Sequence, residues 1–92
     1  MDFEWDATKD ASNRRKHGVS FVEAATLFGD PLAASVPDPD HSARESRFLA
    51  VGHAENGRLL VISYTERDGR IRIVSAREVT PRERRAYERR TR

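Results

Sequence analysis

Arginine is the residue type in this sequence that is best suited to chemistry, and it gathers in the last third of the chain. Residues 67–92 hold ten basic side chains, all of them arginine, and four acidic ones, a net charge of +6. Residues 1–66 hold seven basic and eleven acidic side chains, a net charge of −4. Guanidinium groups are planar, permanently charged forks that pair well with phosphate oxygens. The C-terminal segment therefore favours binding of a nucleic acid or another polyanion.

The groups that could cleave RNA lie among these arginines. Metal-free cleavage needs a base for the 2′-hydroxyl, cations for the pentavalent phosphate and an acid for the leaving oxygen. Tyrosine, glutamate or histidine could move the protons, and Tyr64 or Tyr87 could stack on a base. Alternatively, the strand arginines pair with Glu66, Glu78 and Glu83 and have only a structural role. The composition leaves both interpretations open. The arginines and the polar residues between them are Arg67, Arg70, Arg72, Arg77, Arg82, Arg84, Arg85, Ser75 and Glu88.

Other chemistries have little support. The chain has no cysteine, no G-x-S-x-G motif and no glycine-rich phosphate loop. Asp38, Asp40 and His41 could bind a cation, but such a loop is more often a solvated turn, so we expect no metal and no cofactor. No apolar run is long enough to span a membrane, and the acidic, aromatic start MDFEWD is unlike a signal peptide. A cytoplasmic protein without membrane contact is expected.

The elements that would position these residues begin with a short strand at Phe3-Glu4-Trp5. Asp6 can cap a helix over residues 7–17, and Gly18 suits its C-terminal end. Ser20 can cap a second helix over residues 21–28. The stretch RRKHGVSF (14–21) is therefore explained as a joint between two helices. His17 remains a minor candidate for proton transfer or RNA contact.

A β-rich region and a last helix follow. Residues 32–36 can form a strand, and residues 37–46 are a polar loop. Strands are predicted over residues 47–54, 58–66 and 70–78, joined by Asn56-Gly57 and Asp68-Gly69, pairs typical of tight hairpins. Thr80-Pro81-Arg82-Glu83 is a capping box that begins a helix over residues 81–90. The prediction is one α+β domain over residues 1–92, containing an antiparallel meander.

Two-residue hairpin loops would fix the register of the meander. They place Arg67 opposite Arg70 and Thr65 opposite Arg72. They also place Ile62 opposite Ser75, Leu60 opposite Arg77, His53 opposite Leu60 and Val51 opposite Ile62. One face would then hold the apolar residues Leu49, Val51, Leu60, Ile62, Tyr64, Ile71 and Ile73. Both faces remain partly apolar, so helices or a partner chain should cover each.

Several of these runs together resemble the BrnT family of toxins. The matching runs are FEWD (3–6), N-RR-KHGVSF-V-EAA-T-LF-GDP (13–31), RIRIVSAR (70–77) and ERRAYE (83–88). The resemblance covers nearly the whole chain. It implies a RelE/ParE-like fold and a ribonuclease of a type II toxin–antitoxin system that blocks translation. It also implies a cognate antitoxin that neutralises the toxin and contacts operator DNA, in a heterocomplex that could be a heterotetramer.

The resemblance also implies a set of site residues. Its candidate catalytic residues are Arg67, Arg72, Arg77, Ser75, Glu83 and Tyr87, and we add as RNA-binding candidates Arg70, Arg82, Arg85, Tyr64 and His17. Two alternative functions stay open. One is a non-enzymatic module that acts as antitoxin partner and co-repressor, and the other is a topoisomerase poison.

Overall fold

The computed structural model describes residues 1–91 and has an α+β fold, as predicted. Its elements, in chain order, are β1 (Asp2–Glu4), α1 (Ala7–His17), α2 (Phe21–Ala25), the 3-10 turn η1 (Thr26–Gly29), β2 (Ala34–Pro37), the 3-10 turn η2 (Pro39–His41), β3 (Arg47–His53), β4 (Leu59–Arg67), β5 (Arg70–Glu78) and α3 (Pro81–Arg90). None of the described helices has both the length and the apolar character needed to cross a bilayer.

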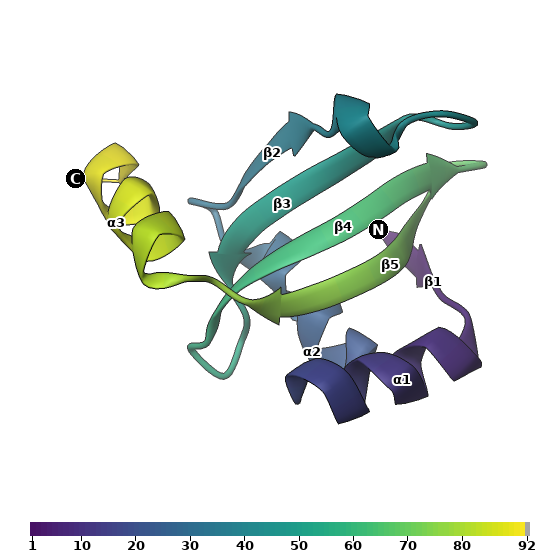
Figure 1. The fold of residues 1–92 in the computed structure, drawn as a ribbon, viewed down its shortest axis with the longest axis horizontal. Helices are drawn as coiled ribbons and strands as arrows, with labels where there is room; N and C mark the ends of the chain where they lie inside the picture. The colour runs from purple at the N-terminus through teal and green to yellow at the C-terminus, as the bar shows by residue number, and fades with distance from the viewer. Residues whose placement is uncertain (92) are drawn as a thin grey trace.

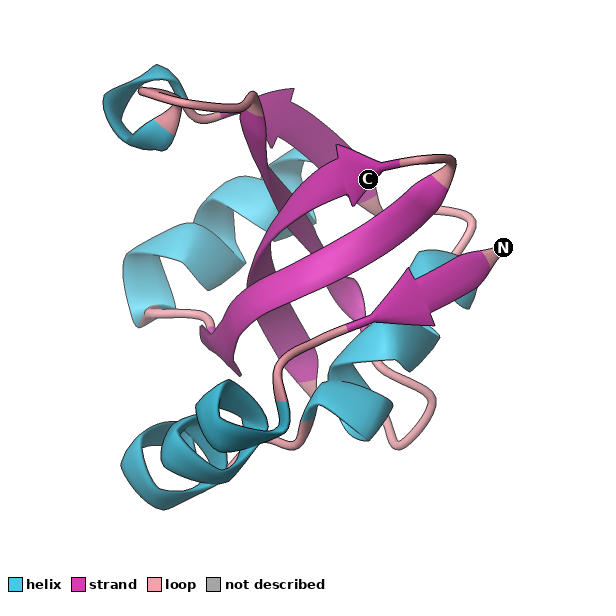
Figure 2. Cartoon of the chain, turned by 90° about the vertical axis from the view of Figure 1, so that its right-hand side faces the viewer, coloured by secondary structure: helices cyan, strands magenta, loops and turns pink. Residues whose placement is uncertain are grey.

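The five strands form one mixed sheet in the order β1-β5-β4-β3-β2. The predicted antiparallel meander is its centre, β1 pairs in parallel with β5, and β2 pairs antiparallel with β3. In Figure 1, α2 lies behind the sheet, α1 runs along its lower margin beside β5, and α3 stands beyond the end of the strands. Figure 2 shows the twist of the sheet and the short β1 at its margin, next to the N-terminus.

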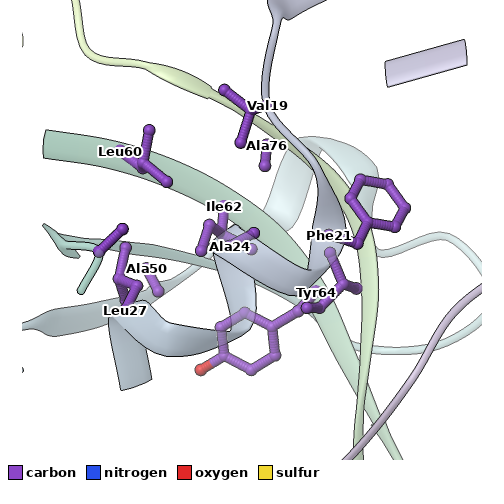
Figure 3. Packing of buried hydrophobic residues seen from close by; sticks show 11 residues of the cluster. Val19, Phe21, Ala24, Leu27, Ala50, Leu60, Ile62, Tyr64 and Ala76 are labelled. Atoms are coloured by element: carbon purple, nitrogen blue, oxygen red, sulfur yellow. The ribbon is translucent and has the colours of Figure 1, made fainter. Parts of the chain in front are cut away.

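The hydrophobic core lies between α2, η1 and one face of the sheet, called here the core face. Phe21 and Leu27 are fully buried in one cluster with Leu60 and Ile62 (Figure 3). Ile73 belongs to the same cluster. Because side chains alternate along a strand, the neighbours of these strand residues point to the opposite side, called here the outer face. Helix α3 approaches the outer face over β2 and β3, and the C-terminal end of α1 approaches it beside β5.

The register prediction is correct at the Asp68-Gly69 hairpin and wrong at the Asn56-Gly57 hairpin. Arg67 lies opposite Arg70, and Thr65 opposite Arg72, as expected. The second loop instead holds three residues, because the Ala54 N–H donates to the carbonyl oxygen of Arg58 and Gly57 takes a φ of 90°. One residue more in this loop moves every partner by one position. The observed partners are Val51 with Val61 and His53 with Leu59.

A bulge in β5 causes the second register error. Tyr64 pairs with Ile73 but Ser63 pairs with Ser75, so Val74 is an extra residue in β5. Ser75 consequently lies opposite Ser63, not Ile62, and the partner of Leu60 is Glu78, not Arg77. The shift at the Asn56-Gly57 loop makes the predicted apolar face wrong too: Leu49 and Val51 lie on the outer face, away from Leu60, Ile62 and Tyr64.

Helix α1 closes the free edge of β5 through one side chain. The Asn13 Nδ2 donates to the carbonyl oxygens of Ala76 and Val19, at 2.8 and 2.9 Å, and the Ala76 N–H donates to Asn13 Oδ1 at 3.1 Å. An amide side chain thus takes the place of a neighbouring strand. The caps predicted for the helix ends are present: Asp6, Ser20 and the Thr80–Glu83 capping box accept the expected N–H groups, and Gly18 has a φ of 68°.

Candidate functional site

The outer face is a set of transverse rows that run across the strands. The first row is Arg47, Thr65, Arg72 and Glu4, the second is Leu49, Ser63 and Ser75, and the third is Val51, Val61 and Arg77. In the second and third rows, polar and charged groups lie at the β5 side and aliphatic groups at the β3 side, whereas the first row is polar or charged throughout. The shift that Val74 introduces brings Ser75 into line with Ser63 on this face.

A hollow of about 230 Å³ lies over the second and third rows. Its lining residues are His17, Leu49, Val61, Ser63, Ser75, Ala76 and Arg77. His17 is four residues after Asn13, so both lie on the side of α1 that meets β5. The hydrogen bonds between Asn13 and Ala76 hold this side of α1 against β5. They thereby place the exposed side chain of His17 beside Ser75 and Arg77.

The guanidinium of Arg77 is held in a fixed orientation. It donates to both carboxylate oxygens of Glu83, at 2.8 and 3.0 Å, and to the carbonyl oxygen of Glu78 at 3.2 Å. The bonds from Arg77 lower the pKa of Glu83 to about 2, and the bond from the Thr80 N–H adds to this effect. Glu83 is therefore ionised near neutral pH and fixes Arg77 without a proton of its own to transfer.

The other strand arginines lie at the opposite end of the outer face, outside the hollow. Arg67 makes a double hydrogen bond with Glu45, at 2.7 and 3.1 Å. Glu4 receives a bond from Arg72 at 2.8 Å and lies 3.7 Å from Arg70. Arg77 does pair with Glu83, as the structural interpretation expected, but Glu66 accepts no ion pair within residues 1–91. Arg82 and Arg85 are exposed on α3, with no ion pair in the same part of the chain.

The two candidate tyrosines are both buried. Tyr64 lies on the core face, with its ring 5.2 Å from that of Phe28 and 5.5 Å from that of Phe48, so no base can stack on it. The RNA contact expected of Tyr64 does not fit this position. Tyr87 lies on the buried side of α3, outside the hollow. Its hydroxyl donates to Asp30 Oδ2 at 3.3 Å. Burial and the charge of Asp30 raise its pKa.

Asp30 is a residue whose role the sequence did not reveal. Its carboxylate accepts the N–H groups of Leu32 and His53 and the hydroxyl of Tyr87. The N–H of His53 is the main cause of its lowered pKa. Asp30 therefore joins η1, β3 and α3. An aspartate that follows a predicted helix and precedes a proline is typical of a helix end, and nothing in the linear pattern indicates its distant partners.

No group of three or more potential metal ligands occurs within residues 1–91. Asp38 and His41, once considered for a cation, are bonded to each other at 2.9 Å.

Comparison with known proteins identifies the family. The family model described as the ribonuclease toxin BrnT of type II toxin–antitoxin systems matches residues 5–83. The chain belongs to the BrnT family. The crystal structure of the Brucella abortus ribonuclease toxin BrnT superposes with a TM-score of 0.69 at 19% identity, covering 87% of this chain and 97% of that one. No curated protein matches the chain.

Membership of the BrnT family indicates the class of activity, which is that of a ribonuclease toxin. BrnT is a family of ribonuclease toxins, and a type II system pairs each toxin with a cognate antitoxin protein. The match spans α1, strands β2 to β5 and the start of α3, so it includes every residue that lines the hollow.

Proposed function

We propose that this BrnT-family toxin cleaves RNA in the hollow formed by His17, Ser75 and Arg77, without a metal ion. The observation that carries the proposal is the gathering of a histidine, two serines and a fixed guanidinium in one hollow, although His17 and Arg77 are far apart in the sequence. RNA cleavage, in which the 2′-oxygen attacks the phosphorus and the 5′-oxygen leaves, needs a group that can accept and return a proton and a cation for the phosphate.

Each residue has a role that follows from its contacts. Arg77, oriented by Glu83, stabilises the charge that develops on the phosphate. Ser63 and Ser75 offer hydroxyl groups that can donate to phosphate oxygens. His17 accepts the proton of the 2′-hydroxyl as that oxygen attacks the phosphorus, and returns it to the 5′-oxygen as the bond from phosphorus to that oxygen breaks. Glu83 positions Arg77 and is not the acid or base, since its pKa is about 2.

The donor set of the hollow supports a metal-free reaction. The lining residues include one histidine and no carboxylate, whereas divalent cations in nucleases are bound by several carboxylate oxygens. Arg67, Arg70 and Arg72, further along the same face, would bind the RNA strand, and Arg82 and Arg85 would do so from α3.

The cellular role follows from the family. Cleavage of RNA in the cytoplasm would block translation. The cognate antitoxin would neutralise the toxin by covering the outer face, where the apolar surface of Val36, Leu49 and Val51 adjoins the arginines. The complex, with two copies of each protein, would contact operator DNA through the antitoxin.

The test is cleavage of a fluorophore-labelled RNA by purified toxin in the presence of EDTA. His17→Ala should lower kcat by about 10²-fold or more, because a general acid–base group is lost. Arg77→Ala should lower kcat by about 10²- to 10³-fold. His41→Ala is the matched control, since His41 is an exposed histidine in the η2 turn, and it should leave kcat unchanged.

Four results would count against the proposal. Full activity of both His17→Ala and Arg77→Ala would place the chemistry elsewhere. Loss of activity in EDTA, restored by Mg²⁺, would contradict the metal-free reaction. Retention of RNA without cleavage by the wild type would favour the non-enzymatic alternative, and early DNA damage in cells would favour a topoisomerase poison.

A further inference from the structure

Two buried polar atoms on the outer face have no hydrogen-bond partner within residues 1–91. They are Nε of Arg47 and Oγ1 of Thr65. Thr65 is only 1% exposed, and the two residues lie directly opposite each other on β3 and β4. Buried polar groups in folded proteins nearly always have a partner, because an unpaired one has lost its hydrogen bonds to water without replacing them. A pair of such atoms on a surface that binds a ligand indicates that the ligand supplies the partner.

The surroundings define the charge of that ligand. Thr65 lies opposite Arg47 on one side and Arg72 on the other, and Arg67 follows two residues along β4. Three of the four neighbours of Thr65 on this face are therefore arginines, and the fourth is Ser63. Two carboxylates face the cluster: Glu4 bonds Arg72, and Glu45 bonds Arg67. Arg47 forms no ion pair within the described chain, so its positive charge is available to an anion.

The row also lies beside the proposed cleavage hollow. Thr65 is two residues from Ser63 along β4, a distance of about 7 Å at 3.4 Å per residue. Ser63 lines the hollow, and Thr65 belongs to the adjacent row. An extended RNA strand with one phosphate in the hollow would therefore place the neighbouring phosphate on this row. The side chains around Thr65 are mostly long arginines, which can move aside to admit a phosphate.

We propose that Arg47 and Thr65, together with Arg72, bind the phosphate next to the scissile one in a single-stranded RNA. The Arg47 fork and the Thr65 hydroxyl donate to its oxygens, and Arg72 adds charge. This inference rests on the proposed ribonuclease function and adds a second phosphate site to it. Such a site would fix the direction in which RNA crosses the hollow and would make substrates with several phosphates better than a dinucleotide.

RNA is favoured over an acidic protein segment as the occupant. Glu4 and Glu45 already supply carboxylates to the neighbouring arginines, and Arg47 and Thr65 remain without a partner beside them. The row is also continuous with the hollow, whereas the apolar surface suited to a protein lies across β2, β3 and α3.

The experiment is a binding cycle with a 2′-O-methyl RNA tetranucleotide, which cannot be cleaved, and with versions that carry a neutral methylphosphonate at one linkage. Arg47→Met should weaken binding of the fully charged RNA about tenfold. It should also lower the slope of log K against log salt by about 0.7. A methylphosphonate at one particular linkage should weaken binding to the wild type by a similar factor. It should hardly change binding to Arg47→Met, because the substitution and the methylphosphonate remove the same contact.

Thr65→Val separates binding from folding. Valine has the shape of threonine without the hydroxyl, so the variant should be as stable as the wild type or slightly more stable, yet bind RNA a few-fold more weakly. Arg89→Met is the matched control for Arg47→Met, since Arg89 is exposed on α3 and forms no ion pair in the described residues. It should bind RNA like the wild type and respond to every methylphosphonate in the same way.

The outcomes distinguish this site from the cleavage function. If Arg47→Met and Thr65→Val both bind RNA like Arg89→Met, the second phosphate site is wrong, even if His17→Ala still abolishes cleavage. A loss of antitoxin binding with unchanged RNA binding would also overturn it and assign the row to the partner protein. If instead the wild type fails to cleave ordinary RNA but the cycle shows coupling at Arg47, the site stands and the cleavage function fails.

Discussion

The two faces of the sheet differ in whether their buried polar side chains have hydrogen-bond partners. Asn13 and Thr65 are the two buried polar side chains within residues 1–91. Asn13, at the edge of the core face, has three hydrogen bonds to backbone groups, and all of its amide atoms are used. Thr65, on the outer face, has none for its hydroxyl. The buried amide beside the core face is fully paired, whereas the outer face contains two buried polar atoms that have no partner within residues 1–91.

This difference indicates that the core face stabilises the domain and that the outer face binds other molecules. The core face buries apolar groups and joins α1 and α2 to the strands. The outer face carries half-exposed ion pairs, which contribute little to stability because solvent screens them. Changes at the core face should therefore lower stability first, and changes on the outer face should lower binding or cleavage first.

The largest loss of stability is expected from Asn13→Ala. Removal of the amide leaves the N–H and C=O of Ala76 and the C=O of Val19 buried without a partner. At about 1–3 kcal/mol for each group, the free energy of unfolding should fall by about 3 kcal/mol or more. Urea denaturation followed by circular dichroism measures this loss. Cleavage should fall too, since α1 no longer holds His17 beside Ser75.

Asn56→Ala is the matched control. Asn56 makes side-chain bonds to Arg58 and Glu23 in an exposed loop, so its loss should cost less than about 1 kcal/mol. If the two variants were equally stable, the bonds of Asn13 would not be what attaches α1 to β5, and the contrast between the faces would be weakened.

A smaller loss is expected from Gly52→Ala, at a close contact on the core side of β3. A Cβ at residue 52 would lie 2.7 Å from Cβ of Ala33 and 3.1 Å from Oδ2 of Asp30. The backbone must shift to relieve this overlap, at a cost of about 1–3 kcal/mol. Thermal unfolding would reveal the change. Gly29→Ala, with open space around the new methyl group, should change stability by no more than about 0.5 kcal/mol. Equal effects at the two glycines would rule out the overlap as the cause.

Local signals predicted most of the fold. Asp6, Ser20 and Thr80 begin helices where their hydroxyl or carboxylate oxygens accept N–H groups, and Gly18 ends a helix with a positive φ. The Asp68-Gly69 turn gave the correct register next to it. These features depend on a few consecutive residues, so they can be read from the linear pattern.

The composition of the candidate site could not be predicted in the same way. The bulge at Val74 and the third residue in the Asn56-Gly57 loop each shift one strand by a single position. A shift of one position exchanges the faces of a strand. It placed Tyr64 and Leu49 on the same predicted face, although the structure puts them on opposite faces. Asn13 and Asp30 act through partners that are distant in the sequence, which no spacing rule reveals.

The smallest effect on stability is expected from the ion pair of Arg77 and Glu83 on the outer face. The ordinary pKa of a glutamate side chain is 4.5, and that of Glu83 falls to about 2 in the folded protein. Because the folded value is the lower one, the pair stabilises the domain fully above pH 4.5, and this contribution disappears as the pH falls toward 2. Both side chains are more than a third exposed, so the contribution is about 1 kcal/mol or less.

Urea denaturation of Glu83→Gln and the wild type at several pH values tests this expectation. The wild type should be slightly more stable near pH 7, and the two proteins should converge as the pH approaches 2. At pH 7, Glu83→Gln should lower kcat for RNA by more than this small stability difference implies, since Arg77 loses the carboxylate that orients it. A loss of 3 kcal/mol or more, with kcat unchanged, would mean that this pair stabilises the fold as the Asn13 bonds do. The division between a structural face and a binding face would then be wrong.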